Sequence, residues 1–189
     1  MKRILAMAWL MAAVALSAQV SSNGPVMADY GKHITEGTPA EQRIAKEVRH
    51  ELLMLPWYSL FDDLEFSVQG NTVTLSGYVT GEHAGTKSSA EKVTEQIEGV
   101  EKVVNNIEVL PPSPLDDRVR EQTYRAMVAA GPLSKYFWEA SPSIHIIVKN
   151  QRIILRGIVY SEGDKNLATI TAKGIPGVFE VTNELRVVK

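Results

Sequence analysis

The sequence predicts an α+β protein built from two tandem small domains. Each domain is expected to run in the order helix, strand, strand, helix, strand, and to form a three-stranded mixed sheet covered on one face by two helices. Three observations predict this fold: an internal repeat, strands in which apolar and polar residues alternate, and helical spacing of the apolar residues ahead of those strands.

The internal repeat emerges when residues 68–79 are aligned with residues 148–159. Apolar, glycine and asparagine positions match between the copies, at Val73 and Ile153, Leu75 and Leu155, Gly77 and Gly157, Gly99 and Gly177, Val103 and Val181, and Asn105 and Asn183. This agreement predicts a tandem duplication. The two strand glycines are interpreted as packing residues that let a helix or another backbone approach closely.

The elements of each copy follow from their local signals. The first helix is expected to begin near Thr38-Pro39, a cap followed by an early proline. A period-2 hairpin turns at Gly70-Asn71, and a second helix ends near Gly99 in copy one or Gly174 in copy two. Ile175-Pro176 predicts that this helix stops earlier in the second copy.

The chain is expected to divide into five segments. Residues 1–28 have the positive start, apolar core and Val26-Met27-Ala28 ending of a signal peptide, with cleavage after Ala28. Residues 29–39 form an N-terminal segment, 40–110 the first domain, 111–114 a proline-rich linker and 115–189 the second domain. The sequence therefore predicts a secreted, periplasmic protein; an N-terminal anchor that is kept instead of cleaved is the alternative.

The composition excludes several classes of protein. There is no cysteine, which excludes disulfides, thiolate metal sites and a lipobox. Residues 40–110 carry 12 acidic and 6 basic side chains, whereas residues 115–189 carry 8 acidic and 11 basic ones. Neither half has the dense basic patch of a nucleic-acid-binding protein, so we expect no nucleic-acid partner.

No arrangement of residues predicts catalysis. The four histidines, His33, His50, His83 and His145, fall in different elements, and no pair has the spacing of a helical metal site. The paired carboxylates at 62–63 and 116–117 are interpreted as helix capping or loop solvation. We therefore expect no enzyme activity, no catalytic residue, no bound metal and no cofactor.

The outward faces of the two predicted sheets differ. In copy one this face is polar and is interpreted as an ordinary solvated surface. In copy two it alternates cations with isoleucines, at His145, Ile147, Lys149, Arg152, Ile154, Arg156 and Ile158. Such an apolar and cationic face predicts a contact with one of three partners: the acidic first copy, another protein, or anionic phospholipid.

Aromatic residues gather after the first helix of each copy. Trp57, Tyr58 and Trp138 are candidates for an aromatic interface, because these side chains suit a membrane–water boundary. The alternative is that the aromatic clusters close the bottom of each small core, with one tryptophan of each cluster partly exposed.

At these residues the chain resembles the BON domain, the module named for osmotically induced periplasmic and nodulation proteins. The resemblance rests on residues 73–79 with 99–109 in copy one, and on residues 153–159 with 177–183 in copy two. It implies small α/β domains that bind and do not catalyse, associated with phospholipid attachment, envelope integrity and osmotic stress. One branch of the family behaves as chaperones toward exported proteins. The missing lipobox departs from the lipoprotein branch.

The function expected from these observations is that of a non-enzymatic periplasmic binding protein of the cell envelope. Its partners would be an anionic phospholipid surface or exported and envelope proteins, with docking between its own two domains as a further contact. The alternative function is a periplasmic chaperone or a protein–protein interaction module of an envelope assembly.

Overall fold

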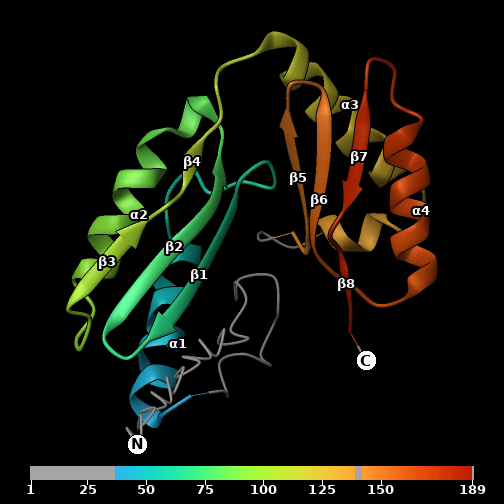
Figure 1. Cartoon of the computed structure of the whole chain (residues 1–189). Coiled ribbons are helices and arrows are strands. Elements are labelled where there is room, and N and C mark those ends of the chain that lie inside the picture. Colours follow the sequence, from blue (N-terminus) through green and yellow to red (C-terminus); the bar gives the residue numbers. More distant parts are fainter. Residues whose placement is uncertain (1–36, 139–141, 189) are drawn as a thin grey trace, which may run out of the picture.

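The computed structural model describes residues 37–138 and 142–188 and contains two copies of one α+β unit (Figure 1). The first unit consists of α1 (Pro39–Leu53), β1 (Asp63–Gln69), β2 (Thr72–Val79), the short 3₁₀ helix η2 (Gly81–His83), α2 (Gly85–Glu95), β3 (Lys102–Asn105) and β4 (Glu108–Val109). The second consists of α3 (Pro114–Ala129), η3 (Ser134–Phe137), β5 (Ile144–Lys149), β6 (Arg152–Val159), α4 (Glu162–Lys173), β7 (Glu180–Asn183) and β8 (Arg186–Val187).

Both sheets are mixed and have the same topology. The central strand, β2 or β6, pairs antiparallel with the preceding strand and parallel with the two short strands that end the copy. The third strand of each sheet is thus divided into two short segments. The two-domain α+β fold predicted from the sequence, with a mixed sheet in each copy, is confirmed.

The repeated asparagine explains why the third strand is divided. The Asn105 side chain accepts a hydrogen bond from the backbone N–H of Ile107 at 3.2 Å and donates to the carbonyl of Lys87 in α2 at 2.9 Å. Asn183 makes the equivalent bonds to Leu185 and Lys165 at 2.9 and 2.8 Å. The amide therefore replaces the broken strand pairing with a connection to the helix.

The apolar core of each copy lies between its helices and one face of its sheet. In the first copy, Ile44 and Val48 of α1 are buried with Phe66 of β1, Leu75 of β2 and Ala90 of α2. The second copy repeats this arrangement with Val119, Met127, Ile146, Leu155 and Ala168. The alternation read from the sequence thus assigns the core-facing residues correctly, because strand side chains alternate between the two faces.

The two strand glycines admit the backbone of the neighbouring strand. Gly77 has φ +110°, and a Cβ there would lie 2.0 Å from the carbonyl oxygen of Asp63. Gly157 has φ +115° and would clash in the same way with Ser143. Any other residue would be both strained and in collision at these positions, which explains why both copies carry glycine.

Two local predictions are wrong. The helix before Ile175-Pro176 does not stop earlier, because α4 ends at Lys173, which aligns with the last residue of α2, Glu95. The carboxylates at 62–63 and Asp116 are not helix caps or solvated loop residues. Asp62 and Asp63 are buried, Asp63 as the first residue of β1. Asp116 is also buried, and Ser113 caps α3. Its carboxylate accepts hydrogen bonds from the N–H groups of Asn150 and Gln151 in the β5–β6 turn, at 2.9 and 2.8 Å.

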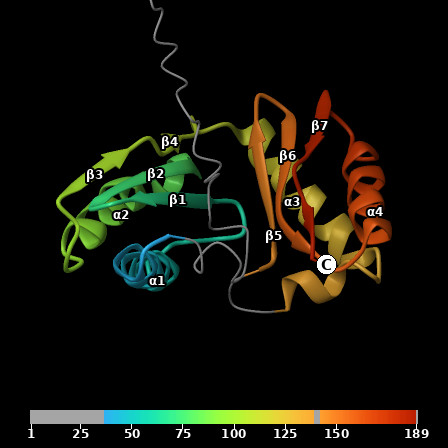
Figure 2. The ribbon, with the colours of Figure 1, turned by 60° about the horizontal axis from the view of Figure 1, so that its bottom comes forward.

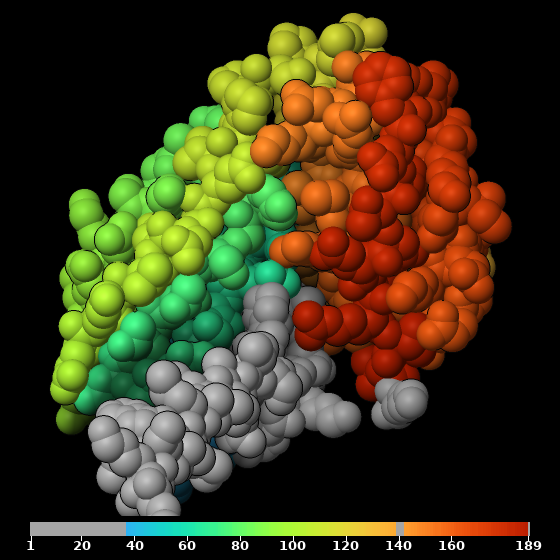
Figure 3. Space-filling view, viewed as in Figure 1, coloured from blue at the N-terminus to red at the C-terminus, as the bar shows by residue number. Residues whose placement is uncertain are grey.

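The two copies lie side by side with their sheets toward the middle of the molecule. In Figure 1 the helices lie on the outer sides, and Figure 2 shows β1 and β5 adjacent at the junction. In the space-filling view the green first copy and the orange second copy meet along the middle (Figure 3).

Candidate functional site

The outward face of the second sheet contacts the first copy through Arg156. Its Nη1 lies 2.8 Å from Oδ2 of Asp63 and 3.0 Å from Oε2 of Glu65, both in β1. Its Nε donates to Glu184 within the second copy at 2.8 Å, and its guanidinium lies 5.5 Å from the ring centroid of Tyr78 in β2. One cation therefore joins carboxylates from both copies.

Burial controls the ionisation of this cluster. Burial, and next the neighbouring charge of Asp63, raise the pKa of Glu65 to about 7, although Arg156 opposes the shift. Burial disfavours the charged Arg156, but its hydrogen bond to Asp63 and the charges of Glu65, Asp63 and Glu184 together raise its pKa above the ordinary value. The cluster thus keeps a permanent cation beside a carboxyl group that titrates near neutral pH.

The other residues of the cationic and isoleucine face lie in different surroundings. Lys149 pairs with Glu108 of the first copy at 2.5 Å, whereas Arg152 pairs with Glu180 in its own copy and is 57 % exposed. Ile147 and Ile158 are buried, and Ile154 is half-buried. Most of the cations and isoleucines that the sequence singles out are therefore covered or paired.

His145 connects the face to the loop after α1. Its Nδ1 lies 2.6 Å from the carbonyl oxygen of Asp62 and must donate there, because a carbonyl only accepts. Its ring lies 5.7 Å from that of Tyr58, centroid to centroid. The backbone N–H of Ile146 also donates to the carbonyl of Leu60 at 2.9 Å, so the loop continues the edge of the second sheet.

The interpretation of the first sheet's outer face as solvated is wrong. Asp63 and Glu65, which belong to that face, are buried, and their carboxylates meet Arg156. Residues further along β1 are less covered, since Ser67 is half-buried and Gln69 is exposed. A polar strand face can be solvated or can meet a complementary charged face, and the alternation of residues does not distinguish the two.

One of the three aromatic candidates is partly buried and two are exposed. Tyr58 packs against the first core, and Leu60 and Phe61 of the same loop pack against the core of the second copy. Trp57 and Trp138 are 74 % and 78 % exposed. Of the three predicted aromatic residues, Tyr58 is thus packed partly against a core and the two tryptophans lie at the surface.

In Figure 1 the short orange helix η3 lies at the end of the second sheet opposite the β5–β6 hairpin, and Trp138 is the residue that follows it. In this region Tyr160 is 66 % exposed, and Nζ of Lys135 lies 5.5 Å from the centroid of its ring. Lys135 also pairs with Asp164 at 3.1 Å, and Asp164 accepts a hydrogen bond from Tyr136 at 2.6 Å. We call Lys135, Trp138 and Tyr160 the aromatic end.

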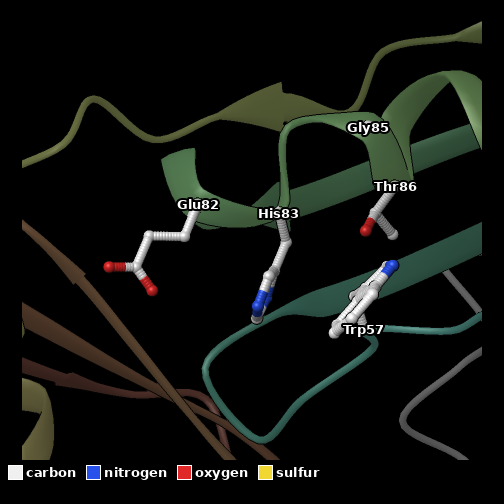
Figure 4. Close-up of a pocket in the computed structure, with 5 residues that line it drawn as sticks. All are labelled: Trp57, Glu82, His83, Gly85 and Thr86. Carbon is white, nitrogen blue, oxygen red and sulfur yellow. The ribbon is translucent and has the colours of Figure 1, made fainter.

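Trp57 lies in a different place, beside a pocket next to the junction of the copies (Figure 4). Its ring is stacked with that of His83 at 6.4 Å between centroids and an interplanar angle of 27°. His83 is held by Asp62, whose buried carboxylate also accepts hydrogen bonds from the backbone N–H groups of Ser59 and Thr80 at 3.0 and 2.7 Å. In the sequence His83 stands apart from the other histidines, and its contacts with Trp57 and Asp62 were not predicted.

Residues 37–138 and 142–188 contain no group of three or more histidine, aspartate or glutamate side chains placed to hold a metal ion. Over the same ranges, no helix is long and apolar enough to cross a membrane. The predicted signal peptide, residues 1–28, and most of the predicted N-terminal segment, 29–39, lie outside the described residues.

The geometry is that of two equivalent α+β units joined by ion pairs, and comparison with known families agrees. The family model described as BON domain matches residues 40–111 and 116–189. The chain belongs to the BON domain family. This is a non-catalytic family, and the two matches reproduce the tandem repeat seen in the sequence.

Solved structures provide weaker comparisons. The C-terminal domain of CdsD, a structural protein of the type III secretion system of Chlamydia trachomatis, is 12 % identical, with 76 % of this chain and 96 % of that chain covered and a TM-score of 0.31. A second CdsD structure is also 12 % identical, with coverages of 77 % and 92 % and a TM-score of 0.31. Structural likeness this weak says nothing of function. Comparison with curated proteins found no match to the sequence.

Proposed function

We propose that this BON-domain protein is a non-enzymatic binding protein of the bacterial cell envelope that attaches to phospholipid surfaces in the periplasm. The observation that carries the proposal is the aromatic end, where Tyr160 is largely exposed beside Lys135, and Trp138, at the end of the same short helix as Lys135, is also largely exposed. Tryptophan and tyrosine favour the membrane–water boundary, because the ring is apolar and its polar edge can hydrogen-bond. The family resemblance supports a role in envelope integrity under osmotic stress.

The lipid contact is assigned to the aromatic end because the face around Arg156 is occupied. Ile147 and Ile158 are buried, and Arg156 and Lys149 already pair with carboxylates of the first copy. Lys135 is the one cation of the aromatic end and already pairs with Asp164. Attachment should therefore rest mainly on the aromatic rings. We therefore expect weak binding to anionic vesicles that depends only modestly on salt.

Flotation with phosphatidylglycerol-containing vesicles tests the proposal. We expect the protein to float with the vesicles, and Trp138→Ala combined with Tyr160→Ala to abolish this. Phe179→Ala is the matched control, because Phe179 is 71 % exposed and its N–H bonds to the β5–β6 turn, at the opposite end of the same sheet. Failure of the protein to float, or equal flotation of the double variant, would rule out attachment at this end.

A second candidate function is that of a chaperone or protein-interaction module. It is favoured by the pocket beside Trp57 and the adjoining pocket beside Arg120, because Thr86 in the first and Arg120 in the second each have a buried polar atom without a partner. Suppression of the aggregation of an unfolded client in the absence of vesicles tests it. Activity in that assay that persists in the Trp138→Ala, Tyr160→Ala variant would assign the two functions to different surfaces.

A further inference from the structure

Two pockets adjoin each other near the junction of the copies, and both are lined by Glu82 and His83. The first has a volume of about 390 Å³ and is also lined by Trp57, Gly85 and Thr86. The second, of about 170 Å³, extends to Pro112 of the linker and Arg120 of α3. The first pocket is in the size range of small-ligand sites, about 300 to 1,000 Å³, and the second is smaller.

Each pocket is lined by a residue that has a buried polar atom without a partner. Among the described residues, Oγ1 of Thr86 and Nε of Arg120 are the only buried side-chain nitrogen or oxygen atoms that lack a hydrogen bond. Thr86 and Arg120 are 3 % and 4 % exposed. An unsatisfied buried polar group is costly, so the occurrence of both atoms at adjoining pockets indicates places for the polar groups of a ligand.

The groups of the first pocket are suited to a cation that donates hydrogen bonds. The carboxylate of Asp62 accepts from Nδ1 of His83, at 3.2 Å, so Nδ1 carries a proton, and when the ring is neutral Nε2 is the nitrogen that can accept a hydrogen bond. The indole of Trp57 offers the ring face that binds cations best. Glu82 adds a negative charge, and Figure 4 shows its carboxylate on the far side of His83 from Trp57.

Thr86 adds a hydroxyl group to this pocket. In Figure 4 the hydroxyl oxygen of Thr86 is turned toward Trp57. A hydroxyl oxygen can accept a hydrogen bond from an ammonium or guanidinium group. The four side chains together therefore provide a ring face, two acceptors and a negative charge.

The second pocket is suited to a hydrogen-bond acceptor, whereas the first is suited to a donor. Arg120 donates from Nη1 to Asp117, and from Nη2 to the carbonyl oxygen of Val148 at 2.7 Å. Its Nε–H is a third donor, and it has no partner. A carbonyl oxygen of a ligand would satisfy it. Phe61, Pro111 and Pro112 are the apolar part of its lining, which also includes the acidic residues Glu82 and Asp117.

We propose that the two pockets form one site for an extended polypeptide segment that carries an arginine or lysine. The basic side chain occupies the pocket between Trp57, His83 and Thr86, and a main-chain carbonyl of the segment accepts from Arg120. A peptide fits better than a simple amine because the site needs a cationic donor and a carbonyl acceptor close together. The inference rests on the second candidate function, binding of polypeptide, and is independent of lipid attachment.

Fluorescence anisotropy with a labelled peptide, acetyl-Gly-Ala-Arg-Ala-Gly-amide, tests the site. The purified protein should bind this peptide, and the same peptide with norleucine in place of arginine should bind at least about tenfold more weakly, since a charge-assisted hydrogen bond and a cation–π contact are lost. Thr86→Val and Trp57→Ala should each weaken binding of the arginine peptide by about five- to tenfold.

Thr86→Val separates binding from folding. It replaces an unpartnered hydroxyl by a methyl group of similar shape, so the melting temperature should not fall. Thr94→Val is the matched control in the same helix: its buried hydroxyl already donates to the carbonyl of Ala90, at 2.7 Å, and its loss should leave peptide binding unchanged.

Three outcomes would overturn the inference. One is equal binding of the arginine and norleucine peptides, and another is unchanged binding in both Thr86→Val and Trp57→Ala. The third is competition by agmatine at the concentrations at which the peptide binds, which would make the site one for a free amine. If one of these outcomes is found while client protection survives Thr86→Val and Trp57→Ala, the chaperone function stands without this site.

Discussion

Arg156 and Asp63 join the two copies of the BON domain, with Nη1 of the guanidinium 2.8 Å from Oδ2 of the carboxylate. They lie on the outward faces of two sheets, at strand positions 93 residues apart in the sequence. Glu65 shares the same nitrogen at 3.0 Å. The face that distinguishes the second copy from the first is therefore directed at acidic partners within the chain.

Replacing Arg156 should destabilise the protein strongly. Arg156→Met leaves two buried carboxylates without their cation, and such a loss costs about 3 kcal/mol. Urea unfolding followed by circular dichroism measures the change. Arg152→Met is the control, because Arg152 pairs with Glu180 at an exposed site and its loss should cost less than about 1 kcal/mol. Equal effects of the two variants would contradict this account of the interface.

Glu65 should make stability depend on pH near neutrality. Its pKa is raised from 4.5 to about 7 in the folded protein, so the folded state binds the proton more tightly than the unfolded state. The contribution of Glu65 to the free energy of unfolding is therefore largest below pH 4.5 and falls as the pH rises to about 7.

Glu65→Gln should remove this dependence. The variant should be more stable than the natural protein at pH 8, by on the order of 2 kcal/mol, and nearly equal to it at pH 5. Unfolding free energies of the two proteins at both pH values give the comparison. A difference that does not change with pH would show that Glu65 does not titrate in this range.

Asp116 should stabilise the β5–β6 hairpin. Asp116→Ala leaves the N–H groups of Asn150 and Gln151 without their acceptor, which should cost about 2 kcal/mol in thermal or urea unfolding. Glu41 has the corresponding role in the first copy, where it accepts from the N–H of Gly70 at 2.7 Å. Glu41→Ala should cost less because that site is exposed; a larger cost there would contradict the comparison.

Gly77 should not tolerate a side chain. Gly77→Ala forces a Cβ against the carbonyl oxygen of Asp63 at a φ of +110°, so unfolding should become easier by at least about 2 kcal/mol. Gly163→Ala in α4 is the control, since its nearest neighbour would be the Oγ of Ser161 at an ordinary 3.6 Å. Little or no loss of stability in Gly77→Ala would mean that β1 can move away from β2.

The fold could be predicted from the sequence because its signals are local. Alternation assigns Phe66 and Leu75 to the core, and the repeated Gly77 and Gly157 mark where neighbouring strands come close. The role of Asn105 was not predicted, although it matches Asn183 in the repeat, because an amide that connects a broken strand to a helix leaves no periodic signal.

The contacts between the copies were harder to predict. The sequence showed that Arg156 lies on an unusual face, but not that it pairs with Asp63 and Glu65, because a period of two identifies a side of a sheet and not what covers it. The one signal of this pairing in the sequence was the contrast between the acidic first half and the basic second half. His83 and Trp57 come from separate elements, so only the folded chain shows their stacking.

The distance between the two copies in solution tests the central claim most directly. The chain has no cysteine, so Lys92→Cys in α2 and Lys173→Cys in α4 would provide two exposed sites for spin labels on the outer helices. Pulsed electron–electron double resonance should give one narrow distribution of distances between the two spin labels. This distribution should broaden when Arg156→Glu is added. A broad distribution without that substitution, or a narrow one that Arg156→Glu leaves unchanged, would contradict the claim that the two copies are held together through Arg156.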